Sequence, residues 1–290
     1  MKTSDFLQLV ILGAIWGASF LFTRIAVPTL GPAWLVAVRI GSGALFLLGA
    51  ALLLRRTLQA QGNVRHYVIL GFFNTGLPFL LFAYAATQLT ASLLSILNST
   101  APIWGAVIGA VLTRTLPPTR VLAGLATGSA GVILLVLKDA SATQAGALLP
   151  VLAAVAAPFC YGLASHYAKA KTGHIEPMAA AHGSMWGALL CLAPATLFAP
   201  FPAAVSPGVG GAALALGVLC TGIAYLMYFR LVRDVGATSA LTVTFLIPLF
   251  GILWGVVFLG EPFGLSTLTG GLIVLAGTAL VTGFNPLRRR

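Results

Sequence analysis

The second half of this 290-residue chain repeats the first half at an offset of 146 residues. At this offset Thr75-Gly76 aligns with Thr221-Gly222, and Pro102 aligns with Pro248. Four glycines of the first half, Gly105, Gly109, Gly124 and Gly131, align with Gly251, Gly255, Gly270 and Gly277. The offset covers five of ten apolar stretches, and because five is odd, a membrane-embedded second half must run in the opposite direction to the first. Such an inverted repeat is typical of carriers that rock two halves around a site in the middle of the membrane.

The composition places most of the chain in a lipid bilayer. Hydrophobic residues make up 59% of it and charged residues 7%, whereas soluble domains carry about 25% charged residues. A span needs about 20 apolar residues, and we predict spans at 6–27, 33–54, 67–87, 91–112, 120–137, 147–168, 178–199, 209–229, 237–259 and 263–284. The chain is therefore predicted to be an all-α membrane protein with ten transmembrane helices, arranged as two inverted five-helix repeats over residues 1–139 and 146–284.

The net charge of +11 is distributed as the topology requires. If both termini are cytoplasmic, every Lys and Arg except Lys138, Arg24 and Arg39 lies on or at the cytoplasmic side. This asymmetry follows the positive-inside rule. It predicts a multi-pass protein of the bacterial inner membrane, whose partners are the bilayer and a small-molecule substrate. It requires no nucleic acid, and we expect a monomer.

The cysteines and the N-terminus add little chemistry. Cys160, Cys191 and Cys220 fall within predicted spans and lack a paired spacing, so we expect neither a disulfide nor a metal site. No cofactor is predicted. The N-terminus lacks the basic start and small-residue cleavage site of a secretory signal, so the first helix is expected to remain in the mature protein.

Three segments resemble motifs of a known family. They are Gly13-Ala14-Ile15-Trp16-Gly17-Ala18-Ser19-Phe20, then Pro32 followed by Arg39, and Pro248 followed by Gly260-Glu261-Pro262 and the Gly270…Gly277 helix. Together they resemble the ten-helix EamA branch of the drug/metabolite transporter superfamily. Length and aromatic content are most similar to the bacterial YddG-type exporters of aromatic and other amino acids. The family often carries a second Glu at the end of helix 4, where this chain has Thr115. Glu261 is expected to cap the start of the tenth helix.

The acidic residues argue against proton coupling. Asp5, Asp139, Glu176, Asp234 and Glu261 all fall in loops or at helix ends. Proton-driven pumps usually place a carboxylate within the membrane, so we predict facilitated transport or exchange. The same absence argues against a small multidrug pump, and the central basic residues are too few for a phosphate exchanger.

Two arginines lie within predicted spans and have more than one interpretation. Arg24 and Arg39 can extend toward the interface or pair with backbone carbonyls. For Arg39, a structural brace or a carboxylate contact remains open.

Aromatic faces in matched helices predict a central cavity. Thr75, Phe79 and Phe82 are spaced by four and three and share one helix face. Their partners in the second half are Thr221, Tyr225 and Tyr228. The predicted substrate-binding residues are Trp16, Phe20, Thr75, Phe79, Phe82, Ser95, Asn98, Tyr161, His166, Tyr225, Tyr228 and Phe245. Aromatic walls with a few polar groups suit a small amphipathic solute. The alternative is helix packing, with hydroxyls bonded to their own backbone.

The matched prolines predict a pair of hinges. Pro102 and Pro248 each free a backbone carbonyl and weaken a helix. Gly105-x-x-x-Gly109 and Gly251-x-x-x-Gly255 follow them, so helices 4 and 9 are expected to pack closely yet bend. Close packing alone also explains this glycine spacing.

These features predict a carrier that exports small metabolites by alternating access, with amino acids, aromatic ones among them, as its substrates. Purines, sugars and toxic compounds are alternative substrates. An intramembrane enzyme is disfavoured, because His182 and Ser184 are two apart and point to different helix faces. A channel is disfavoured because no carbonyl-rich or acidic ring is evident.

Overall fold

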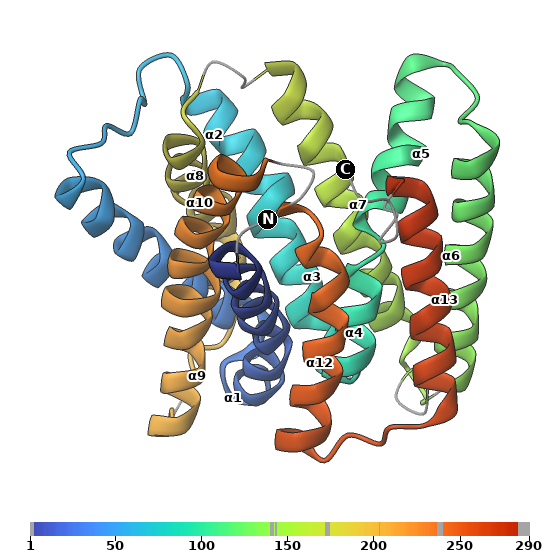
Figure 1. Ribbon diagram of the computed structural model, residues 1–290. Coiled ribbons are helices and arrows are strands. Elements are labelled where there is room, and N and C mark those ends of the chain that lie inside the picture. Colours follow the sequence, from blue (N-terminus) through green and yellow to red (C-terminus); the bar gives the residue numbers. More distant parts are fainter. Residues whose placement is uncertain are drawn as a thin grey trace.

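The computed structural model describes residues 3–139, 142, 144–171, 175–202, 204–236 and 240–283. Within these residues the chain forms helices and their connections, without a β-strand (Figure 1). The α-helices are α1 (Thr3–Leu53), α2 (Val64–Gly71), α3 (Leu77–Ala85), α4 (Ala91–Asn98), α5 (Ala101–Thr113), α6 (Thr119–Lys138), α7 (Leu148–Lys171), α8 (Pro177–Phe198), α9 (Pro207–Gly217), α10 (Ala224–Val235), α12 (Val243–Leu259) and α13 (Leu265–Thr282). Two π-helical segments are η1 (Phe72–Gly76) and η2 (Val218–Ile223).

The outer surface of the bundle matches a bilayer. Eight described helices are long and apolar enough to cross a membrane, and α12 is apolar but shorter. Large apolar side chains such as Leu52, Val111 and Leu190 are exposed, at 69%, 71% and 66%. An apolar exterior of this extent indicates contact with lipid. The prediction that the chain is an all-α membrane protein is confirmed for the described residues.

The longest helix turns a corner at Gly31. This glycine has φ 68° and ψ 163°, and lies between Pro28 and Pro32. A positive φ is easily reached only by glycine, and a residue before proline is driven out of the α region. The predicted spans 6–27 and 33–54 are therefore the two arms of α1, joined by this single corner.

Two continuous helices each contain a π-helical segment. The segment η1 joins α2 to α3, and η2 joins α9 to α10. Their first residues, Phe72 and Val218, are 146 positions apart, so the irregularity recurs at the repeat offset. π-Segments often occur at functional sites because they interrupt the regular backbone hydrogen bonds. Both segments contribute side chains to the cavity described below.

The two prolines occupy different environments. The predicted helix 91–112 is broken, because Ser99 and Thr100 form a turn between α4 and α5. Pro102 then lies in the first turn of α5, where its missing N–H has no helical partner to lose. Pro248 instead lies within the continuous helix α12. The helix around Pro248 is continuous, but it begins at Val243 after a turn at Leu241 and Thr242, so the predicted span 237–259 is shortened at its start.

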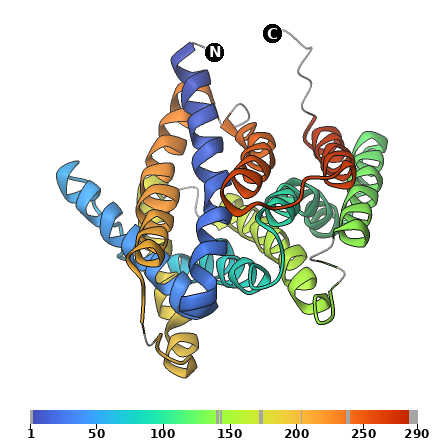
Figure 2. The same cartoon turned by 90° about the horizontal axis from the view of Figure 1, so that it is seen from below.

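Glycines set the closest helix contacts, with one exception. Helices α6 and α13 lie side by side (Figures 1 and 2), with Gly124 against Gly277 and Gly131 against Val274. Close approach of this kind is typical of membrane helices. At Gly105 the close contact is made by its backbone, against Gly162, and nothing lies within 4 Å of where its own side chain would be.

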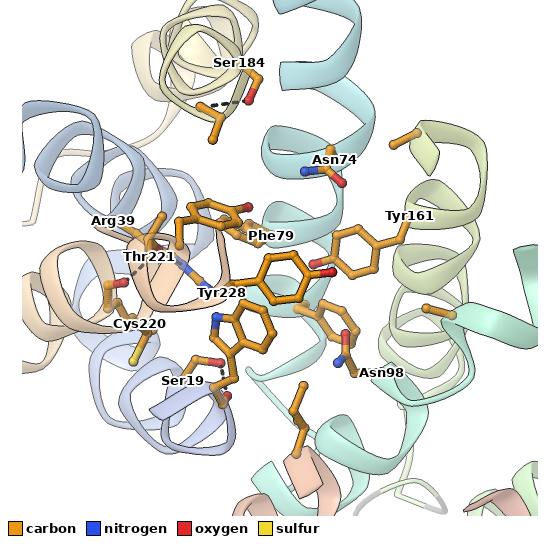
Figure 3. A pocket seen from close by; sticks show the side chains of 18 of the residues that line it. Ser19, Arg39, Asn74, Phe79, Asn98, Tyr161, Ser184, Cys220, Thr221 and Tyr228 are labelled. Atoms are coloured by element: carbon orange, nitrogen blue, oxygen red, sulfur yellow. Dashed lines mark hydrogen bonds between the residues drawn. The ribbon is translucent and has the colours of Figure 1, made fainter. Parts of the chain in front are cut away.

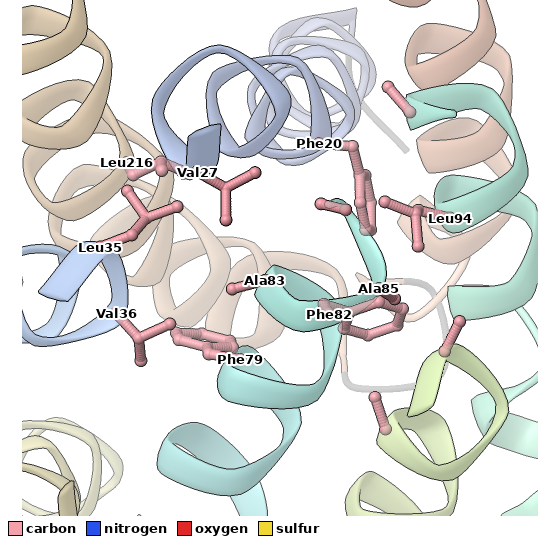
Figure 4. Packing of buried hydrophobic residues seen from close by; sticks show 14 of the residues in the cluster. Phe20, Val27, Leu35, Val36, Phe79, Phe82, Ala83, Ala85, Leu94 and Leu216 are labelled. Atoms are coloured by element: carbon pink, nitrogen blue, oxygen red, sulfur yellow. The ribbon is translucent and has the colours of Figure 1, made fainter. Parts of the chain in front are cut away.

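Much of the hydrophobic core lies at one end of the bundle. Figure 4 shows Phe20 beside Leu94 and Phe82 beside Ala85, with Val27 on the side of Phe20 away from Leu94. All five side chains are buried. Many residues of the largest buried cluster lie where α3 ends and α4 begins, and two smaller clusters lie elsewhere in the bundle.

Candidate functional site: a central aromatic cavity

A cavity of about 500 Å³ lies in the middle of the bundle (Figure 3). It is lined by both arms of α1, by α2, η1 and α3, by α4, α5, α7 and α8, and by α9, η2, α10 and α12. Ligand pockets in proteins are typically about 300–1,000 Å³ and mostly apolar, with a few polar groups. The cavity has the size and character of a small-molecule site.

The cavity collects most of the residues predicted to bind substrate. The lining includes Trp16, Phe20, Phe79, Phe82, Asn98, Tyr161, Tyr225 and Tyr228. The remaining four, Thr75, Ser95, His166 and Phe245, are not among the described residues that line it. The structure therefore brings together the aromatic faces of both halves, while the four others lie elsewhere on the same helices.

The four residues outside the lining lie in other environments. Thr75 is buried within η1. The Ser95 hydroxyl donates to the Ser92 carbonyl oxygen at 2.8 Å, and its side chain packs against Gly251. His166 Nδ1 lies 3.0 Å from the Gly162 carbonyl oxygen, one turn back on its own helix. Phe245 lies in the first turn of α12.

The aromatic walls of the cavity are ordered by contacts between rings. The Trp16 and Tyr228 ring centroids are 5.5 Å apart, and those of Phe20 and Phe82 are also 5.5 Å apart in an edge-to-face arrangement. Both distances lie in the favourable range for aromatic pairs, about 4.5–7 Å. Each pair joins a residue of the first arm of α1 to a residue of another helix, so ring contacts link this arm to α10 and to α3.

Most hydroxyl groups in the lining are already occupied. Ser19, Ser165 and Ser184 donate to the carbonyl oxygens of Trp16, Gly162 and Ala181 on their own helices. This is the local bonding expected of serine in a membrane helix.

The Asn98 side chain differs from these serines. It lines the cavity without a hydrogen bond to any described residue (Figure 3). A cavity-facing amide carries two donors and an acceptor, so Asn98 is available to a solute.

A positive charge lies in the cavity wall. Arg39 Nε donates to Thr221 Oγ1 at 3.3 Å, and its Cζ is 3.7 Å from the Phe79 ring centroid. A guanidinium over an aromatic face gains cation–π stabilisation. The sequence left the role of Arg39 open, and the structure places it in the cavity beside Cys220 and Thr221.

Arg24, unlike Arg39, bonds the protein backbone. Its Nη1 donates to the Ala86 carbonyl oxygen at 2.6 Å. The interpretation of Arg24 as pairing with a backbone carbonyl is confirmed.

None of the acidic residues is among the residues that line the cavity. Glu176 pairs with Arg56 at 3.2 Å, and Asp234 pairs with Arg230 and Arg233. Asp5 lies in the first turn of α1, and Asp139 follows the last residue of α6. Among the described residues no three His, Cys, Asp or Glu side chains gather as a metal site would require.

Glu261 corrects one expectation. It is buried, and it caps α4 rather than the helix that follows it. Its Oε1 accepts from the Ala91 N–H at 2.6 Å, and its Oε2 accepts from the Ser92 N–H at 3.0 Å and from the Ser92 hydroxyl at 2.7 Å. The carboxylate therefore accepts hydrogen bonds from the N–H groups at the start of a helix about 170 residues away in the sequence.

Several lining residues were not among the predicted substrate-binding residues, although Thr221 was named as the repeat partner of Thr75. Asn74, Cys220 and Thr221 come from the π-segments, and Ser184 comes from α8. The repeated Thr-Gly pairs marked both π-segments in the sequence. Ser184 was considered only as half of a disfavoured His182–Ser184 pair.

Comparison with known proteins places the chain in a family. The EamA-like transporter family matches residues 5–137 and again residues 148–283. An uncharacterized transporter of Archaeoglobus fulgidus is 27% identical over 97% of this chain and 98% of its own length. The uncharacterized transporter YoaV of Bacillus subtilis is 23% identical over 92% and 93%. A crystal structure with 18% identity superposes with a TM-score of 0.66 over 97% of this chain and 96% of the other, which shows a shared fold. This chain is thus a member of the EamA-like transporter family, a multi-pass membrane transporter and not an enzyme.

Proposed function

We propose that this protein exports small metabolites across the bacterial inner membrane, with amino acids, aromatic ones among them, as its substrates. The cavity carries the proposal: about 500 Å³ of space, walled by aromatic rings from both halves and holding few free polar groups. Such a site accommodates an apolar or aromatic body and orients it by a small number of polar contacts. Alternating access about this cavity would move the solute.

Helix packing supports two inverted repeats. Gly124, Gly131 and Leu135 of α6 meet Gly277, Val274 and Gly270 of α13 in that order, so these helices are antiparallel. In the repeat alignment they are equivalent helices, and equivalent helices that run antiparallel are what inversion requires.

A second pair of contacts supports the same symmetry. Gly17 packs on Gly251, and Gly162 packs on Gly105. The first members differ by 145 residues and the second by 146, so each contact is the repeat partner of the other. Ten spans follow if the two arms of α1 and the short α12 each cross the bilayer.

The charge distribution supports cytoplasmic termini and a cavity that faces inward. Figure 1 draws the connections α1–α2 and α5–α6, the end of α7 and the start of α8 at its upper end. Those segments contain Arg55, Arg56, Arg114, Arg120, Lys169 and Lys171. The cavity lining reaches Ala168 and Pro177 at this end, while many residues of the largest buried cluster lie at the opposite end, where α3 ends and α4 begins. By the positive-inside rule the basic end is cytoplasmic.

Transport should not require a proton gradient. The cavity lining contains no carboxylate among the described residues, and a buried acid is the usual coupling group. Purified protein in liposomes loaded with unlabelled phenylalanine, with equal pH on both sides, should accumulate radiolabelled phenylalanine by saturable counterflow. Flux that disappears whenever a pH gradient is collapsed would contradict the uncoupled mechanism, and conductance without saturation would contradict a carrier.

Substitutions in the cavity wall should distinguish contacts to groups that all amino acids share from contacts to aromatic side chains. Trp16→Ala or Tyr225→Ala should weaken transport of aromatic substrates about 2- to 10-fold, because an aromatic pair contributes roughly 0.5–1.5 kcal/mol beyond area burial. Asn98→Ala should weaken the transport of small polar and of aromatic amino acids alike, since its amide would hold the backbone groups that they share. The measurement is the concentration of each amino acid that half-saturates counterflow. Unchanged preference in all three variants, at normal insertion, would show that these faces serve packing.

A further inference from the structure

We infer that Arg39 anchors a carboxylate group of the transported solute, so that the cavity selects small amphipathic acids and zwitterions over neutral or cationic analogues. This inference rests on the proposed function, because it takes the cavity to be the solute site. It adds the chemical group that the site recognises and the residue that recognises it.

The guanidinium is held in place from two sides. Thr221 Oγ1 donates to the Leu216 carbonyl oxygen at 2.8 Å, which leaves a lone pair of the hydroxyl to accept from Arg39 Nε at 3.3 Å. The Phe79 ring lies under the guanidinium, 3.7 Å from Cζ to the centroid. A planar group restrained in this way is already oriented for a ligand, which reduces the entropy lost on binding.

The outer part of the guanidinium remains available. Neither Nη group forms a hydrogen bond with any described residue, and Figure 3 draws the Arg39 nitrogens between Thr221 and Tyr228, directed into the cavity. An arginine fork binds the two oxygens of a carboxylate in parallel. The free edge of Arg39 therefore presents the geometry that a carboxylate needs.

The charge of Arg39 is not compensated by the protein. It is the one charged side chain among the described residues that line the cavity. All five acidic residues of the chain are described, and none forms an ion pair with it. An unpaired charge inside a membrane protein is unfavourable, and a bound carboxylate would supply the missing partner.

The far wall fits the rest of such a solute. Tyr161 and Asn98 lie across the cavity from Arg39 and Thr221 (Figure 3). Rings there can receive an apolar or aromatic body while the carboxylate stays at Arg39. This arrangement favours a molecule with its acid at one end and its apolar part at the other.

The test compares ligands that differ in one group. Binding of L-phenylalanine, 3-phenylpropionate, L-phenylalaninamide and phenethylamine is followed in detergent by tryptophan fluorescence, since Trp16 lines the cavity. We expect the two carboxylates to bind about 10- to 100-fold more tightly than the amide and the amine, as hydrogen bonds to charged groups imply. Equal affinities would overturn the inference, and this comparison needs no variant that must fold.

Variants then assign the preference to one residue. Arg39→Gln should abolish the preference for carboxylates, and Arg39→Lys should retain part of it. Arg24→Gln is the matched control, because Arg24 also lies within a span but bonds the Ala86 carbonyl away from the cavity; it should keep the full preference. A preference that survives in folded Arg39→Gln would overturn the assignment.

Counterflow in liposomes distinguishes a failure of the carboxylate anchor from a failure of the proposed carrier function. Saturable transport of both phenylalanine and phenylalaninamide with equal affinity would leave the carrier function standing and overturn the anchor. A clear preference for carboxylates in binding, with no amino acid transported, would contradict the proposed function and support the anchor.

Discussion

Replacing Glu261 with alanine is expected to lower the melting temperature of the purified protein more than any other single change considered. Glu261 is 8% exposed, and its carboxylate is the acceptor for two backbone N–H groups and one hydroxyl at the start of α4. Hydrogen bonds to charged groups contribute about 1.5–3 kcal/mol each, and buried donors left without a partner are unfavourable. We therefore expect the free energy of unfolding to fall by about 3 kcal/mol or more.

Two further variants make this result specific. Glu261→Gln keeps one acceptor oxygen but places an NH₂ group against the Ser92 donors, so its melting temperature should be intermediate. Glu176→Ala is the matched control: it also precedes a helix, but it forms no capping bond and only an exposed ion pair with Arg56, worth about 0–1 kcal/mol. Thermal unfolding in detergent measures all three. If Glu261→Ala melts with the wild type, α4 does not depend on this cap.

A second large effect is expected for Gly71→Ala. A methyl group at Gly71 would overlap the Ser184 carbonyl oxygen and the Ala188 nitrogen, which are backbone atoms of α8. Because a backbone cannot rotate away as a side chain can, the two helices must separate. Overpacking typically costs about 1–3 kcal/mol and occasionally more. We expect lower thermal stability and a smaller monodisperse fraction after extraction in detergent.

The same substitution at Gly105 provides the control. Gly105 lies within α5, with nothing inside 4 Å of its missing side chain. Alanine is favoured over glycine in a helix by roughly 0.5–1 kcal/mol, so Gly105→Ala should be neutral or slightly stabilising. If alanine lowered thermal stability equally at both positions, the loss at Gly71 would not be due to its contacts with α8.

Much of the candidate site followed from spacing on single helices. Phe79 and Phe82, with Tyr225 and Tyr228 as their repeat partners, all line the cavity, because residues three and four apart share a helix face. Ser95 and Asn98 were both predicted to bind substrate, yet Ser95 packs against Gly251. Both residues lie in α4, three positions apart, so their spacing alone did not determine which of them faces a neighbouring helix and which faces the cavity.

The sequence by itself determined the class of protein and the positions of its helices. Hydropathy and span length depend on each segment alone, because a backbone in lipid must satisfy its own hydrogen bonds whatever its neighbours are. The tertiary structure decided which distant groups meet. It brought Glu261 to Ala91 and Ser92, and Arg39 to Thr221 and Phe79. These contacts depend on how helices are rotated and how deeply they pack, which close contacts between side chains and glycines set and no local pattern of residues encodes.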